Sequence, residues 1–186
     1  AHLVSGRPLG GGVGYLSVLC DRGMGYAVSQ VDGIYTYPTA TATWDADVIA
    51  HEIGHNFGSE HTQSCYWQSH GFAPAGALLD SCVGAEGACY SGPTGLLPAN
   101  RGTIMSYCHL IAGVASGIRM AFHPACATVM RAGAEACLPR SPFDPGTQIA
   151  AATQGPDVTL AWAASTVPGV IRYDVYRGLT SLGSAP

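Results

Sequence analysis

The stretch His51–His61, which reads HEIGHNFGSEH, constrains the fold of this chain more than any other. His51 and His55 are four residues apart, and residues four apart on an α-helix share one face with Cβ atoms about 5–6 Å apart. Gly58 then stands where a helix would end, because glycine adopts a left-handed backbone at no steric cost. The stretch predicts a helix over residues 45–57 that stops sharply before His61.

The residues that precede the histidines favour the same helix. Asp45 and Asp47 come near its expected N-terminus, where carboxylates interact favourably with the helix dipole. An apolar side is expected from Val48, Ile49, Ile53 and Phe57.

The three histidines of this stretch predict one catalytic zinc ion. His51 and His55 reach it from the helix, and the turn at Gly58 returns His61 to the same ion. Three imidazoles and one water form an open, catalytic arrangement, whereas a structural site would use four protein ligands. Glu52 would take a proton from the zinc-bound water and pass it to a leaving amine, which is peptide-bond hydrolysis without a covalent intermediate. The alternative is an incidental cluster of solvated histidines.

The full pattern HExxHxxGxxH, with Met105 downstream in TIMSY, resembles the metzincin zinc endopeptidases. The resemblance implies an α/β (α+β) zincin-like fold, with Met105 as a hydrophobic floor beneath the zinc ligands and not as a fourth ligand. It also implies that Tyr107 lies near the zinc, either as a hydrogen-bond donor to the developing oxyanion or as a residue packed in the turn.

The opening segment AHLVSGRPLGGGVGYLSVLC resembles the reprolysin (adamalysin) type of metzincin, and the similarity extends over residues 1–138. The catalytic domain of that family begins earlier, so we expect an N-terminally truncated domain here. Two positions depart from the family: Thr62 replaces the usual Asp after the third histidine, and Thr103 replaces the usual Cys before Met105. A bacterial reprolysin-like branch fits this combination best.

Alternation predicts short strands at residues 13–20 and 26–31, and a helix is expected at residues 124–137 with Pro124 in its first turn. The resemblance favours the edge of the sheet for the strand at 13–20, where an extended substrate could add by backbone hydrogen bonds. An ordinary core-facing strand is equally compatible with its alternation. Residues 62–104 are rich in Gly, Ser and Pro and predict a long irregular segment.

Seven cysteines favour disulfides and an oxidising compartment over reduced core thiols, and none forms a CxxC pair. We expect Cys20 to pair with Cys126 or Cys137, Cys65 with Cys108, and Cys82 with Cys89. The odd count leaves one cysteine without a partner in this chain.

The C-terminal part predicts a separate module. Residues 139–156 read as a linker rich in Pro, Gly and Ala, and the alternating residues beyond it resemble the opening strands of a fibronectin type III-like domain over residues 157–186. The resemblance implies a partial all-β sandwich, with Trp162 on its second strand and Tyr173 on its third. Such modules act as spacers or as contacts to surfaces and polymers.

Composition excludes several other functions. The net charge is −4 without basic clusters, which argues against nucleic acid, and no apolar run is long enough to span a bilayer. All positively charged side chains are arginine, which favours a GC-rich bacterial genome. We expect a secreted protein whose signal peptide precedes this sequence.

The sequence thus predicts a secreted zinc endopeptidase that acts on protein or peptide substrates, with His51, His55 and His61 as ligands and Glu52 as general base. Two alternatives remain: a catalytically silent zinc-binding adhesion module, and a zinc hydrolase with a non-protein substrate. His2, His70, His109 and His123 lack partner spacing and are expected to be surface or cap residues. The sequence does not indicate whether calcium binds as well.

Overall fold

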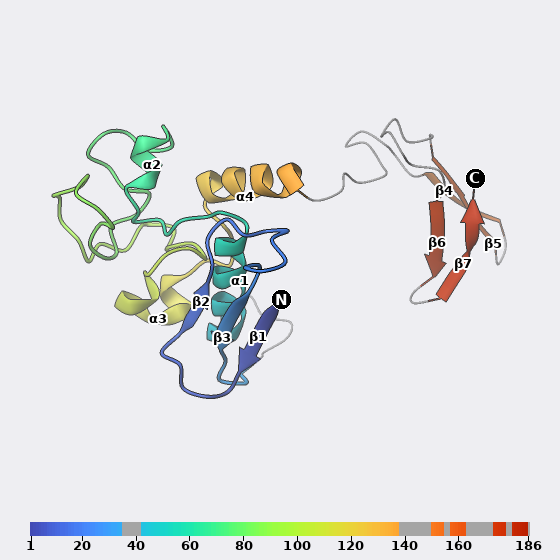
Figure 1. Cartoon of the computed structure of the whole chain (residues 1–186), viewed down its shortest axis with the longest axis horizontal. Helices are drawn as coiled ribbons and strands as arrows, with labels where there is room; N and C mark the ends of the chain where they lie inside the picture. Colours follow the sequence, from blue (N-terminus) through green and yellow to red (C-terminus); the bar gives the residue numbers. More distant parts are fainter. Residues whose placement is uncertain (35–41, 138–149, 155–156, 163–172, 178–179, 186) are drawn as a thin grey trace. The chain divides into compact units, whose positions relative to one another are not determined.

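The chain divides into two compact units, Ala1–Leu138 and Pro139–Pro186. The computed structural model describes residues 1–34, 42–137, 150–154, 157–162, 173–177 and 180–185. The first unit combines a small sheet with helices, which confirms the expected mixed α/β class (Figure 1). Among the described residues, no helix has the length and apolar character needed to cross a membrane.

The sheet of the first unit has the order β1–β3–β2, formed by His2–Ser5, Ala27–Gln30 and Gly12–Gly14 respectively. β1 runs parallel to β3, and β2 runs antiparallel to it, so β2 lies at one edge. β3 confirms the strand expected at residues 26–31.

The strand predicted over residues 13–20 is wrong in length, since β2 covers only Gly12–Gly14. Beyond β2, backbone amides donate to carbonyl groups at the C-terminal end of α1 (Trp44–Asn56) instead of to a neighbouring strand. Ser17 N–H donates to His55 O and Leu19 N–H donates to Asn56 O, both at 2.9 Å. This segment therefore closes over the end of that helix.

Four helices complete the described part of the first unit. α1 covers Trp44–Asn56 and α4 covers Pro124–Cys137, which confirms both predicted helices, α1 to within one residue. α2 covers Tyr66–Ser69 and α3 covers His109–Gly117. The predicted irregular segment is confirmed, because α2 is only one turn long and the rest of residues 62–104 consists of turns, bends, isolated bridges and irregular backbone. α3 and β1 were not predicted.

The core lies between α1, α4 and the segment around Met105. Its buried members are Trp67, Ile104, Met105, Ala125 and Cys126. A second, smaller cluster contains Ala42, Cys82, Cys108 and Ile118. Met105 is fully buried against α1, since a Cβ added to Gly54 would lie 2.5 Å from the Met105 sulfur.

Three disulfides close the first unit. Cys20–Cys137 confirms one of the two expected pairings, and Cys126 is free and buried. The other two predictions are wrong: the bonds are Cys65–Cys89 and Cys82–Cys108. The folding of the irregular segment brings these cysteines together. Their spacing along the chain therefore did not predict which of them pair.

In the second unit, β4 (Ala150–Gln154) pairs antiparallel with β5 (Asp157–Ala161), and β6 (Tyr173–Arg177) pairs antiparallel with β7 (Thr180–Ala185). β4 lies within the stretch that the sequence analysis predicted as a linker over residues 139–156. Trp162 directly follows β5, and Tyr173 opens β6. Residues 139–149 and 155–156 of the predicted linker, and residues 163–172, 178–179 and 186 of the predicted module, lie outside the described residues.

Candidate metal centre

α1 presents three chemically active side chains on neighbouring turns. Its N-terminus is capped by Thr43, whose side chain accepts a hydrogen bond from Ala46 N–H at 3.4 Å. His51 and His55 follow one helical turn apart, with Glu52 beside the first. Gly58 then takes a φ of +98°, as its place at the helix end predicted, and the chain turns back to bring in His61.

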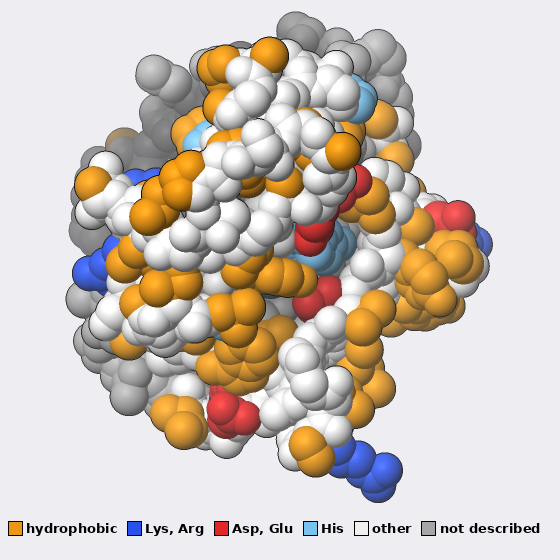
Figure 2. Space-filling view, turned by 90° about the vertical axis from the view of Figure 1, so that its left-hand side faces the viewer, with side chains coloured by type: hydrophobic (Ala, Val, Ile, Leu, Met, Phe, Trp, Pro, Cys, Tyr) orange, Lys and Arg blue, Asp and Glu red, His pale blue; other side chains and the backbone are white. Residues whose placement is uncertain are grey.

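The three histidines come together in space. One ring nitrogen of His51, one of His55 and one of His61 lie within 4.8 Å of one another. The Nε2 atoms of His55 and His61 are 3.1 Å apart. Figure 2 shows histidine side chains deep in a hollow of the surface, with acidic side chains on two sides.

Hydrogen bonds fix how each ring is oriented. The Nδ1 atom of His51 is 2.7 Å from Ile104 O, that of His55 is 2.8 Å from Ser59 O, and that of His61 is 2.7 Å from Glu86 Oε1. Since each of these partners is an acceptor, each Nδ1 carries the proton and donates it. The Nε2 atoms are then left with lone pairs.

This arrangement fits a metal ion. Two Nε2 lone pairs at 3.1 Å repel one another, and a cation between them would replace the repulsion by coordination. Three imidazoles of this kind form an open site suited to zinc, which leaves one position for water or substrate.

Burial favours the neutral, metal-binding form of the His51 and His55 rings. It lowers the pKa of His51 to about 3, and the adjacent His55 and His61 act in the same direction. The pKa of His55 is also lowered, mainly by burial and then by His61. Histidine binds a metal ion only as the neutral ring. Protons therefore compete little with a metal ion for His51 and His55 at neutral pH.

Glu52 is buried against the edge strand. A Cβ added to Gly12 would lie 2.5 Å from the Glu52 side chain, and one added to Gly14 would lie 2.5 Å from the Glu52 carbonyl. Burial raises the pKa of the Glu52 carboxyl to about 7, against an opposing effect of the Gly14 backbone. A carboxyl with such a pKa both accepts and returns protons near neutral pH.

Tyr107 and Met105 hold different places around the histidines. The Tyr107 hydroxyl is 3.1 Å from His61 Nε2, and its ring stacks at 5.9 Å from that of His51. The pKa of Tyr107 is raised, chiefly by burial and then by Glu86 and Glu52, so the phenol keeps its proton for donation. Met105 packs against α1, with its sulfur beside Gly54.

Glu86 is a site residue that the sequence analysis missed. Its carboxylate binds His61 Nδ1 and accepts a second hydrogen bond from Gln63 Nε2 at 3.0 Å. Its backbone is tied to Cys65 and Gln63, and the Cys65–Cys89 disulfide closes the loop that carries it. Glu86 lies 25 residues after His61 in an irregular segment, so no spacing rule pointed to it.

Thr62, which departs from the reprolysin pattern, connects the third histidine to the Met105 segment. Its N–H donates to Met105 O at 3.0 Å, and its hydroxyl lies 3.3 Å from the same oxygen. These two contacts hold the backbone that follows His61 against the backbone at Met105.

None of the remaining histidines of the first unit has a ring nitrogen in the converging group. His2 bonds to Ser29 through Nε2, and His70 stacks on Tyr66. His109 lies near Tyr107 and Trp44 but is not among the three ring nitrogens that converge. A second group of potential ligands, Asp80 with Cys82 and Cys108, is not a metal site because both sulfurs belong to one disulfide.

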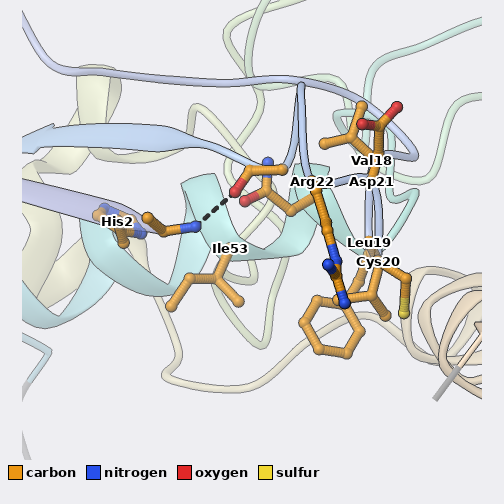
Figure 3. Close-up of a pocket in the computed structure, with 11 residues that line it drawn as sticks. His2, Val18, Leu19, Cys20, Asp21, Arg22 and Ile53 are labelled. Carbon is orange, nitrogen blue, oxygen red and sulfur yellow. Dashed lines mark hydrogen bonds between the residues drawn. The ribbon is translucent and has the colours of Figure 1, made fainter.

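A separate cavity of about 620 Å³ lies on the side of α1 that carries Ile53. Figure 3 shows His2 and Ile53 on one side of it, with Leu19, Cys20, Asp21 and Arg22 on the other. Neither Glu52 nor any of the three converging histidines lines it. We assign no chemistry to this cavity.

Comparison with protein-family models matches residues 1–113 to metallo-peptidase family M12. The matched residues include the three histidines, Glu52 and Tyr107. Comparison with curated proteins and with solved structures gives no match.

Proposed function

Because the chain belongs to metallo-peptidase family M12, we propose that it is a zinc-dependent endopeptidase in which His51, His55 and His61 bind the ion and Glu52 is the general base. One observation carries the proposal. Three imidazoles donate through Nδ1 to neighbouring oxygens, and one ring nitrogen of each lies within 4.8 Å of one ring nitrogen of each of the other two, next to the buried side chain of Glu52.

Each residue has a role that its contacts support. Zinc, when bound, supplies Lewis acidity and lowers the pKa of a water molecule to about 7. Glu52 accepts the proton of the attacking water on its carboxylate and delivers it to the amine that leaves. The Tyr107 hydroxyl donates to the carbonyl oxygen as negative charge develops there.

The edge strand β2 is the surface that we propose for substrate binding. Among the described residues β2 pairs with β3 alone, so we propose that its other side accepts an extended peptide. Gly12 and Gly14 approach Glu52 closely, and a peptide that adds to β2 would pass beside the general base. This mode suits unfolded or flexible substrates.

We further propose that the protein is a secreted metzincin of a bacterial reprolysin-like branch. Three disulfides support an oxidising compartment. The hairpins of the second unit support a partial fibronectin type III-like module that acts as a spacer or contacts a surface or polymer.

Cleavage of an unfolded protein substrate by the full chain tests the proposal. Cleavage should stop with a zinc chelator, return when zinc is restored, and be absent in Glu52→Gln at unchanged zinc content. A Glu135→Gln variant removes an exposed carboxylate on α4 and should cleave normally. Bound zinc without cleavage would instead support the adhesion-module alternative.

A further inference from the structure

A cavity of about 240 Å³ adjoins the metal centre and extends along the N-terminal half of α1. Its walls include both His51 and Glu52, so the cavity opens onto the proposed reaction site. Pockets for drug-sized ligands measure roughly 300–1,000 Å³, so this smaller space suits a single side chain of a substrate.

Asp47 lines this cavity one helical turn before His51. Its side chain is buried, with 2% of the residue exposed, and its Oδ1 atom has no hydrogen-bond partner. The neighbouring Asp45 is equally buried, but its two oxygens accept hydrogen bonds from the backbone N–H groups of Asp32 and Ile34. Asp47 is therefore the one of the two whose side chain has a buried oxygen without a hydrogen-bond partner among the described residues.

No cation within the described part of the chain neutralises Asp47. The single salt bridge there joins His61 and Glu86. His109 lines the same cavity, but burial lowers its pKa and favours the neutral ring. A buried carboxyl with an unpartnered oxygen gains most from a ligand that brings a positive charge.

The other walls suit the stem of a long cationic side chain. Trp44 packs edge-on against His109 at 5.7 Å, and its Nε1 already donates to Gln30 O. Tyr107 completes an aromatic lining. Aromatic rings accept the methylene stem of lysine or arginine and interact favourably with a guanidinium or ammonium group.

We propose that Asp47 forms a specificity subsite that selects a lysine or arginine side chain next to the scissile bond. The inference rests on the proposed peptidase function. Asp47 would accept hydrogen bonds from the substrate cation at its Oδ1 atom, and the aromatic walls would hold the stem.

The test is a peptide series in which each residue that flanks the cleaved bond is in turn lysine, arginine, norleucine or glutamate. In the zinc-loaded wild-type chain, lysine should exceed norleucine in kcat/KM at one flanking position by roughly 10- to 100-fold, and glutamate should be rejected. Asp47→Asn should reduce the ratio of lysine to norleucine to near one, with norleucine cleavage retained. The exposed change Glu135→Gln should leave the ratio unchanged. Equal cleavage of lysine and norleucine peptides by the wild-type chain would overturn the inference.

A binding measurement separates this inference from the proposed function. In the Glu52→Gln background, calorimetry should show tighter binding of the lysine peptide than of the norleucine peptide, and a further Asp47→Asn change should abolish the difference. If no peptide is cleaved by the wild-type chain but this difference is present, the peptidase proposal fails and the cation subsite stands. If peptides are cleaved without any difference in binding, the subsite fails and the peptidase proposal stands.

Discussion

Two regions of the first unit build the candidate metal centre in different ways. α1 places His51, Glu52 and His55 by helical periodicity, with an N-cap at one end and a glycine turn at the other. The segment His61–Cys108 contains one short helix, and it brings in Glu86 and Tyr107 by backbone hydrogen bonds and two disulfides. One half is positioned locally, and the other half only by tertiary structure.

The comparison teaches that the two halves depend on different interactions. A helix retains the spacing of its side chains as long as the helix exists. The irregular segment retains its arrangement only while its cross-links and buried bonds hold. Changes in the irregular segment should therefore affect zinc binding by destabilising that segment or by altering the orientation of His61.

Removal of a ligand from each half should give the largest effect. Both His51→Ala and His61→Ala should lower zinc affinity by roughly 1,000-fold, since each ligand contributes a comparable share of the binding free energy. Competition with a chromophoric chelator measures the affinity. His70→Ala, an exposed histidine on Tyr66, is the control. Unchanged zinc affinity in His61→Ala would show that the irregular segment supplies no zinc ligand.

The second largest effect concerns Asp47 on α1. Burial raises its pKa from 3.8 to about 7, so the folded state holds this proton more tightly than the unfolded state. The resulting stabilisation is present below pH 3.8 and is lost as the pH rises through 7, which amounts to at most about 4 kcal/mol. Asp47→Asn should match the wild type near pH 4 and exceed it in free energy of unfolding at pH 8.

Denaturant unfolding across that pH range measures the difference. Asp45→Asn provides a contrast, because it weakens the acceptor of two backbone N–H groups and should destabilise at both pH values. A constant difference between Asp47→Asn and wild type would show that Asp47 does not titrate in this range.

The third effect separates the two halves through their disulfides. The double change Cys65→Ser with Cys89→Ser should lower the free energy of unfolding by about 3 kcal/mol and also weaken zinc binding, because it frees the loop of Glu86. Cys20→Ser with Cys137→Ser should lower stability while the folded protein keeps its zinc affinity. Equal zinc affinity in both double variants would contradict this division.

The fourth effect tests Tyr107 in the reaction. Tyr107→Phe should lower kcat by roughly 100-fold, because it removes a donor to the developing oxyanion. Zinc affinity should stay within a factor of about two, since the ligands remain. Steady-state kinetics beside zinc titration measures both. Unchanged kcat would assign Tyr107 to packing in the turn.

The smallest effect concerns the orientation of the third ligand. Glu86→Gln should weaken zinc binding by about 10-fold, at the low end of the range for such partners, because the Glu86 side chain is 42% exposed. Glu60→Gln removes a nearby carboxylate that makes no hydrogen bond to a ligand ring and is the matched control. A similar loss in both variants would indicate a general electrostatic effect.

The same division explains what the sequence could predict. Local rules were sufficient for α1 and for the turn at Gly58, and the three histidines converge as their spacing suggested. No local rule relates Glu86 to His61. Asp47 was predicted on the helix, but its burial depends on packing against distant residues, which periodicity does not encode.

The two disulfides of the irregular segment interleave along the chain in the order Cys65, Cys82, Cys89, Cys108. Short loops close at lower entropic cost, so Cys82 and Cys89 are the pair that meets most readily while the chain is still unfolded. That bond is absent from the native protein and must be broken by thiolate attack before either native bond can form. Oxidative refolding should therefore pass through a trapped isomer, and a disulfide isomerase should accelerate the recovery of zinc binding.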